Sequence, residues 1–189
     1  MSIVVPAPDA SVRRATPNDA PAVGAVQAAV WTQAYATHLP DEVVAAFTPA
    51  AFGTAWRTSL TRPPAGIHQL LVALTGARIV GFVAIGPAQD PDADADQAEL
   101  TAIGVHPGAR GEGHGSRLLN AAVDVLREAG ATAVSTWVLT DQDDVRRFLT
   151  GSGFAPDGAH RERVVAPDGR TLREVRLIVA IGPPAPELS

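Results

Sequence analysis

The stretch from Ala98 to Gly130 most constrains the fold, because it predicts a strand, a glycine-rich loop and a helix in direct succession. The strand covers Glu99 to Val105 and ends at His106-Pro107, since proline lacks the N–H that a central strand needs. Gly104 interrupts the apolar strand pattern, which indicates a bulge or the close approach of a ligand. The helix carries apolar residues at three- and four-residue spacing: Leu118, Leu119, Ala122, Val125, Leu126 and Ala129.

The loop between strand and helix has glycines at alternate positions, Gly111, Gly113 and Gly115. Glycine lets neighbouring backbone N–H groups point toward one place, and the first turn of the helix adds unpaired N–H groups and a positive dipole end. This combination binds anions, above all phosphate. Arg110 and Arg117 place positive charge on either side.

The spacing excludes two common phosphate motifs. A dinucleotide fingerprint needs a glycine where Ser116 stands, and a P-loop needs Lys and then Ser or Thr where His114 and Gly115 stand. A glycine-rich turn that merely caps a helix remains the alternative.

The loop resembles the coenzyme A pyrophosphate loop of GNAT-type N-acetyltransferases, Gln/Arg-x-x-Gly-x-Gly/Ala, through Arg110, Gly113 and Gly115. The preceding Ile103-Gly104-Val105-His106-Pro107 resembles that family's fourth strand and its exit. The resemblance runs from Val12 to Ala180 and is specific over Glu99 to Gly130 and at Gly153-Phe154.

The resemblance implies acetyl-coenzyme A as co-substrate. No metal is expected, because the chain has no cysteine and its five histidines show neither HxH nor HxxxH spacing. In that family the pantetheine arm enters where the fourth and fifth strands splay apart at a bulge, and Gly104 is expected to form it. The backbone of Ile103 and Val105 would bond the pantetheine, and the N–H of Val105 would polarise the thioester carbonyl. The pyrophosphate would contact the loop residues Arg110, Gly111, Glu112, Gly113, His114, Gly115 and Ser116.

The helix before Gly153-Phe154 departs from the family pattern. Counting back from that dipeptide, Gln142 stands where many members have Asn near coenzyme A, and it is the expected cofactor contact there. Leu149 stands where they have the Tyr proposed to protonate the leaving thiolate. A leucine cannot donate a proton, although a thiol with a pKa near about 8.5 is a fair leaving group unaided.

The rest of the chain predicts one α+β domain over 12–181, between tails at 1–11 and 182–189. The expected sheet is mixed and mostly antiparallel, with about 6–7 strands, a central parallel pair and about 4–5 flanking helices, as in the GNAT fold. Expected strands are 12–16, 68–74, 78–85, 99–105, 133–139, 161–165 and 171–180, and expected helices follow Asp19 and Asp41 and cover 49–60, 118–129 and 141–149. The acidic segment 86–97 is expected to be a solvated hairpin loop, because it lacks the glycine and glutamate of a calcium loop.

Trp31, Tyr35 and His38 share one helix face, which is typical of core packing. In the GNAT family, the first two helices roof the acceptor site, so these three residues, with Trp137, are the candidate substrate-binding residues.

The predicted reaction is transfer of the acetyl group to a primary amine of a small molecule or peptide. Direct attack is expected, because the chain has neither cysteine nor a G-x-S-x-G serine. The amine needs a base to remove its proton. Glu99, at a position where the family often has glutamate, is the candidate, and an ordinary strand-end charge is the alternative. A non-catalytic acyl-coenzyme A sensor or a partner domain with a degenerate site is the alternative function.

Composition also bears on nucleic-acid binding, membrane association and cellular location. The chain of 189 residues has a net charge of −5 without a basic stripe, which argues against nucleic-acid binding. No apolar run reaches membrane-spanning length and no signal peptide is evident, so a cytoplasmic location without membrane partners is expected. The enrichment in alanine, proline and arginine is typical of a high-GC bacterial coding sequence. Whether the protein forms a homodimer is left open.

Overall fold

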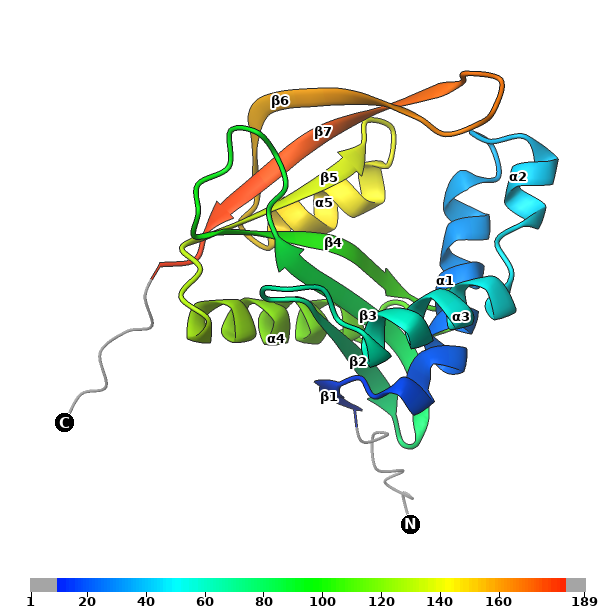
Figure 1. The fold of residues 1–189 in the computed structure, drawn as a ribbon, viewed down its shortest axis with the longest axis horizontal. Helices are drawn as coiled ribbons and strands as arrows, with labels where there is room; N and C mark the ends of the chain where they lie inside the picture. Colours follow the sequence, from blue (N-terminus) through cyan, green and yellow to red (C-terminus); the bar gives the residue numbers. More distant parts are fainter. Residues whose placement is uncertain (1–9, 183–189) are drawn as a thin grey trace, which may run out of the picture.

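The computed structural model describes residues 10–182, which form a seven-stranded sheet with helices on both faces (Figure 1). The strand order is β1-β2-β3-β4-β5-β7-β6, and every neighbouring pair is antiparallel except β4 and β5. The strands are β1 (Ala10–Arg14), β2 (Gln69–Thr75), β3 (Arg78–Pro87), β4 (Gln97–Val105), β5 (Ala133–Leu139), β6 (Ala155–Val164) and β7 (Thr171–Ala180). The helices are η1 (Pro17–Asp19), α1 (Ala20–Tyr35), α2 (Asp41–Ala45), α3 (Pro49–Thr61), η2 (Pro107–Ala109), α4 (His114–Glu128) and α5 (Asp143–Gly151). This confirms the expected α+β fold with its central parallel pair.

The sheet separates two apolar clusters. On one face α1 and α3 pack against β2 and β3, with Val23, Val72 and Phe82 fully buried. On the other face α4 and α5 cover the sheet, and Leu118, Leu126 and Leu149 fill that side of the core. Because helices lie on both sides, β2 is buried along almost its whole length and has no polar face.

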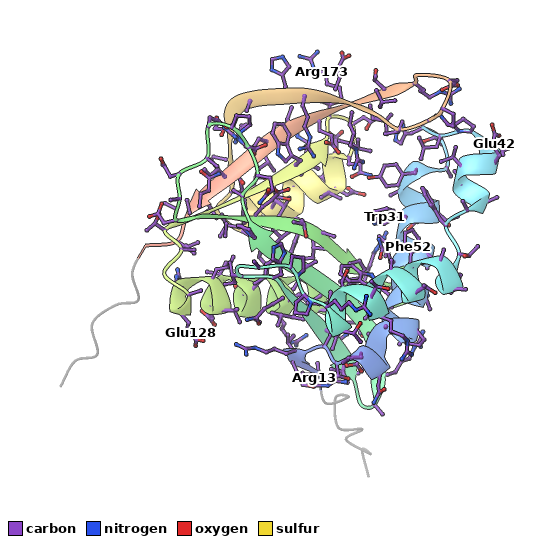
Figure 2. All side chains as sticks on the ribbon, viewed as in Figure 1. Arg13, Trp31, Glu42, Phe52, Glu128 and Arg173 are labelled. Atoms are coloured by element: carbon purple, nitrogen blue, oxygen red, sulfur yellow. The ribbon has the colours of Figure 1, made fainter. Side chains whose placement is uncertain are left out.

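Helices α1 and α3 approach each other closely at two glycines. A Cβ at Gly24 would lie 2.5 Å from the carbonyl oxygen of Pro49 and also collide with the backbone of Gly53. A larger residue would therefore force the two helices apart. Their packing fixes the carboxyl end of α1 over the sheet, where Trp31 contacts Phe52 edge to face (Figure 2).

The parallel strands β4 and β5 pair only at their beginnings, where Gln97–Glu99 lie beside Ala133–Ser135. Beyond this point β4 stays with β3 and β5 stays with β7, so the two strands diverge (Figure 1). The hydroxyl of Thr136 donates to the carbonyl of Leu100 at 2.8 Å and holds the base of this fork.

The bulge in β4 lies at Thr101 rather than at Gly104, where it was expected. Ala84 pairs with Ala102 and Ile85 pairs with Leu100, which leaves Thr101 as the extra residue. Gly104 pairs regularly with Phe82. Its missing side chain serves packing, because a Cβ there would lie 3.0 Å from the Phe82 ring.

Several boundaries differ from the sequence expectation. β6 begins at Ala155 rather than Arg161, and α5 begins at Asp143 with Gln142 as its N-cap residue. Asp41 is the first residue of α2 and not its cap, which is Pro40. Residues 1–9 and 183–189 of the expected tails lie outside the described residues, whereas Ala10 and Ser11 belong to β1. Over residues 10–182, none of the helices has the length and apolar character to span a membrane.

Candidate active site

The glycine-rich loop leads into α4 through a left-handed turn. Gly111 and Gly113 have φ values of +81° and +80°, and Gly113 is the N-cap residue of the helix. The backbone N–H of Arg117 bonds the carbonyl of Gly113. The N–H groups of His114, Gly115 and Ser116 come before that bond in the first turn, so they are the donors that a helix start leaves for a ligand. The geometry is that of an anion site.

Two arginines brace this loop from either side. Arg110 donates through Nε to the carbonyl of Val105 at 3.2 Å, and Arg117 donates through Nη1 to the carbonyl of Glu112 at 2.8 Å. Both guanidinium groups are thereby held beside the N-terminus of α4, where the sequence analysis expected fixed positive charge.

Two predicted loop residues turn their side chains away from the anion site. The His114 ring is buried, with Nε2 3.1 Å from the Thr75 hydroxyl and 3.3 Å from the Glu112 carboxylate. The Glu112 side chain is thus engaged with His114 and does not line the cavity described next. Only the backbone of these residues is available to an anion.

A single cavity of about 830 Å³ joins the glycine loop to the fork between β4 and β5. Its lining brings together most of the predicted site residues: Trp31, Tyr35, Ile103, Gly104, Val105, Arg110, Gly111, Gly113, His114, Gly115, Ser116, Trp137 and Gln142. Glu99, Glu112 and His38 are not part of the lining. His38 lies in the turn after α1, with its Nε2 3.5 Å from the carboxylate of Asp141, which does line the cavity.

The backbone of Ile103 and Val105 faces the fork. The N–H of His106 bonds the carbonyl of Val80 in β3, and hydrogen-bonding direction alternates along a strand. Gly104 therefore also faces β3, whereas Ile103 and Val105 direct their N–H and C=O groups away from β3. The bond from Arg110 to the Val105 carbonyl agrees with this orientation.

Glu99 lies at the other face of the sheet from α4 and α5, because its neighbours Ala98 and Leu100 point into the cluster beneath those helices. Burial raises the pKa of its carboxyl group above the ordinary value, and the negative charge of Asp90 adds to the rise. The positive charge of Arg161 and a hydrogen bond from the backbone of Gln89 oppose it, while Glu174 contributes a smaller rise. Glu99 is thus a carboxylate of increased basicity beside the fork.

The acidic loop between β3 and β4 is not simply solvated, in contrast to the expectation from its composition. Asp90 and Asp92 bond the Arg176 guanidinium at 3.2 and 2.6 Å, and Asp157 bonds its Nε at 2.7 Å. Arg176 is only 7% exposed. In Figure 1 this loop runs beside β6 and β7. The loop is therefore fixed over the same face of the sheet as Glu99.

A second charged group on this face was missed by the sequence analysis. Glu174 in β7 is buried, lines the cavity, and accepts from Arg161 at 2.6 Å. Arg163 lies 3.4 Å from the same carboxylate and 3.5 Å from the hydroxyl of Tyr35. The Arg161 guanidinium also stacks on the Trp137 ring, 4.3 Å from its centroid. Only the strand register, in which Arg161 pairs with Glu174, brings these residues together.

The aromatic residues of α1 pack against one another and also line the cavity. Trp31 and Tyr35 pack edge to face with each other and with Phe47, and both line the cavity. Leu149 lines the cavity from α5 and is buried. Within residues 10–182 no three His, Cys, Asp or Glu side chains are grouped so as to hold a metal ion.

Comparison with known proteins agrees with this architecture. A mycothiol acetyltransferase of Beutenbergia cavernae is 38% identical over 69 residues, which are 36% of this chain and 23% of that protein. N-acetyltransferase 8F1 of Rattus norvegicus is 31% identical over 87 residues, 46% of this chain and 39% of that one. The chain thus matches well under half the length of either relative.

Among solved structures, the PaiA N-acetyltransferase of Thermoplasma acidophilum in complex with coenzyme A superposes with a TM-score of 0.66 at 16% identity. The match covers 88% of this chain and 98% of that one, and it shows a shared fold. The sequence profile described as the acetyltransferase (GNAT) family matches residues 28–154. The chain therefore belongs to the acetyltransferase (GNAT) family.

Proposed function

We propose that this protein transfers the acetyl group of acetyl-coenzyme A to a primary amine by direct attack, without an acyl-enzyme. The observation that carries this proposal is the single cavity that joins a phosphate-type loop to an open strand fork. Glu99 lies at the base of the same fork, on the face of the sheet opposite α4 and α5. Such a site can hold a long phosphorylated thioester on one side and admit an amine from the other.

The residues fit coenzyme A in two places. The N–H groups of His114, Gly115 and Ser116 would bind the pyrophosphate, with Arg110 and Arg117 as flanking cations. The backbone of Ile103 and Val105 faces the fork and would pair with the pantetheine amides as a neighbouring strand does. Gln142 would contact the same arm from the start of α5.

Each proton and bond can be assigned. The amine must lose a proton to become nucleophilic, and Glu99 would accept it directly or through water. The nitrogen then forms a bond to the acetyl carbon while the carbon–sulfur bond breaks, and it loses a second proton to water. The Val105 N–H would stabilise the negative charge that develops on the carbonyl oxygen. The thiolate of coenzyme A departs without a proton from Leu149, because the pKa of its thiol, near about 8.5, permits this.

The decisive experiment is incubation with acetyl-coenzyme A and a panel of amines while free thiol is followed. Because the chain has no cysteine, every thiol detected comes from coenzyme A. Amine-dependent thiol release with formation of the acetylated amine supports the proposal. Tight binding of acetyl-coenzyme A without turnover would support the sensor instead, which the leucine at position 149 favours. Absence of binding would reject both.

A further inference from the structure

We propose that the acceptor carries a carboxylate beside the amine that is acetylated, and that Arg161 and Arg163 bind this carboxylate. The inference rests on the proposed function, because it names the substrate class of the same site. It is carried by four features: the single carboxylate that both arginines share, the fixed orientation of the guanidinium groups, their place at the cavity and their proximity to Glu99.

Both arginines contact the same carboxylate. Glu174 lies 2.6 Å from Arg161 and 3.4 Å from Arg163. The other acidic groups of this face are Glu99 and the three aspartates that Arg176 binds, Asp90, Asp92 and Asp157. Two guanidinium groups that share one direct partner keep N–H donors for a further anion.

The two guanidinium groups are held in place before any ligand arrives. Arg161 uses Nε for Glu174 and stacks on Trp137, which leaves both of its terminal nitrogens free to donate. Arg163 is positioned between Glu174 and the hydroxyl of Tyr35. Their side chains are 40% and 44% exposed, so a ligand can reach them. A planar fork held in this way is suited to a carboxylate.

Both arginines stand at the rim of the cavity, because each contacts residues that line it. Glu174, Trp137 and Tyr35 all belong to the lining. The rings of Tyr35 and Trp31 also offer apolar surface for the side chain of an acceptor. An aromatic α-amino acid therefore matches the chemistry of this end of the cavity.

The carboxylate-binding groups and the base are neighbours. Glu99 pairs with Ser135, and Arg161 stacks on Trp137, two residues further along the same face of β5, so the two side chains are neighbours. An amine directed to Glu99 would thus have Arg161 nearby for an anionic group on the adjacent carbon. This is the arrangement of amine and carboxylate in an α-amino acid.

A binding experiment tests this inference without requiring turnover. The protein saturated with coenzyme A is titrated with N-acetyl-L-phenylalanine and with its amide, and tryptophan fluorescence is followed. The acid is expected to bind at least tenfold more tightly than the amide, and Arg163→Gln should reduce the ratio to within about twofold. Arg163→Lys keeps the charge without the fork and should retain part of the preference.

Arg173→Gln is the matched control, since Arg173 is an exposed residue that alternates to the other face of β7 (Figure 2). Its acid-to-amide ratio should equal that of the wild type. Equal affinities for acid and amide in the wild type, no binding of either, or a ratio that survives Arg163→Gln would overturn the inference.

Turnover separates this inference from the proposed function. L-Phenylalanine and L-phenylalaninamide are compared in the thiol assay. If both are acetylated equally well, the enzyme proposal stands and the carboxylate inference fails. If neither is acetylated while the acid still binds preferentially, the carboxylate site stands and the enzyme proposal fails.

Discussion

The indole nitrogen of Trp137 donates to the carboxylate of Asp90 at 3.1 Å, across 47 residues of sequence. The same carboxylate accepts from Arg176, so one aspartate joins the β3–β4 loop to both β5 and β7. Asp90 also lies near Glu99, and its negative charge adds to the rise that burial causes in the pKa of that carboxyl group.

Arg176→Gln is expected to destabilise the fold by about 1–3 kcal/mol, because it leaves partly buried carboxylates without their cation. Asp90 and Asp157, with side chains 13% and 22% exposed, would remain unpaired. Urea unfolding measures the loss. Arg170→Gln is the control, since Arg170 and its partner Asp168 are both about half exposed, and it should cost under about 1 kcal/mol. Similar losses in the two variants would show that the Arg176 cluster does not stabilise the fold.

Glu99→Gln is expected to reduce turnover by about 10²- to 10⁴-fold with little change in coenzyme A affinity, since it keeps the size and removes the base. In the wild type, kcat/KM should fall as the pH drops through the raised pKa of Glu99, and this limb should vanish in the variant. Steady-state rates across the pH range provide the measurement. Turnover within about threefold of wild type at neutral pH would reduce Glu99 to a strand-end charge.

The same substitution has a predicted effect on stability. A carboxyl group whose pKa is higher in the folded state than its unfolded value of 4.5 stabilises the fold most below that value, and the contribution is lost as the pH rises through the folded pKa. Glu99→Gln should therefore raise the melting temperature at about pH 7, and the gain should shrink toward about pH 4. A gain that grows on acidification would contradict the raised pKa.

Leu149→Tyr places a hydroxyl at the position where many family members are expected to have the Tyr proposed as the acid. The position is buried and lines the cavity, so the ring can face the fork. If thiolate protonation limits the rate, turnover should rise; if the hydroxyl finds no partner, stability should fall by about 1–3 kcal/mol. Thiol release and melting temperature are measured together. Unchanged turnover in a stable variant would show that thiolate departure is not limiting or that Gln142, Ser152 or water already supplies the proton.

Local patterns were sufficient to predict the loop, the helix that follows it and the parallel strand after that helix. Each depends on residues close in sequence, as with Gly113 at the start of α4. The β4 bulge was misplaced because its position is set by the pairing of Ala84 and Ile85 across the sheet, which no feature of β4 itself reveals.

Ion pairs between residues that are far apart in the sequence could not be predicted from the sequence either. The acidic loop has the composition of a solvated segment, and its partner Arg176 lies 84 residues beyond Asp92. Arg161 and Glu174 become neighbours only through the register of β6 and β7. The loop and fork proposed to bind coenzyme A were therefore predictable from local motifs, whereas the charged face proposed to bind the acceptor required the fold.

Calorimetric titration with coenzyme A tests the central claim most directly, with Gly113→Val compared to wild type. Gly113 needs a positive φ and an open backbone at the anion site, so the variant should bind coenzyme A at least tenfold more weakly, about 1.4 kcal/mol. Gly130→Val is the control, since Gly130 has a φ of +88° just after the other end of α4 with no atom near its Cβ position. The Gly130→Val variant should have similar backbone strain, but its affinity for coenzyme A should equal that of the wild type. Unchanged affinity in a folded Gly113→Val variant would contradict the assignment of this loop to coenzyme A.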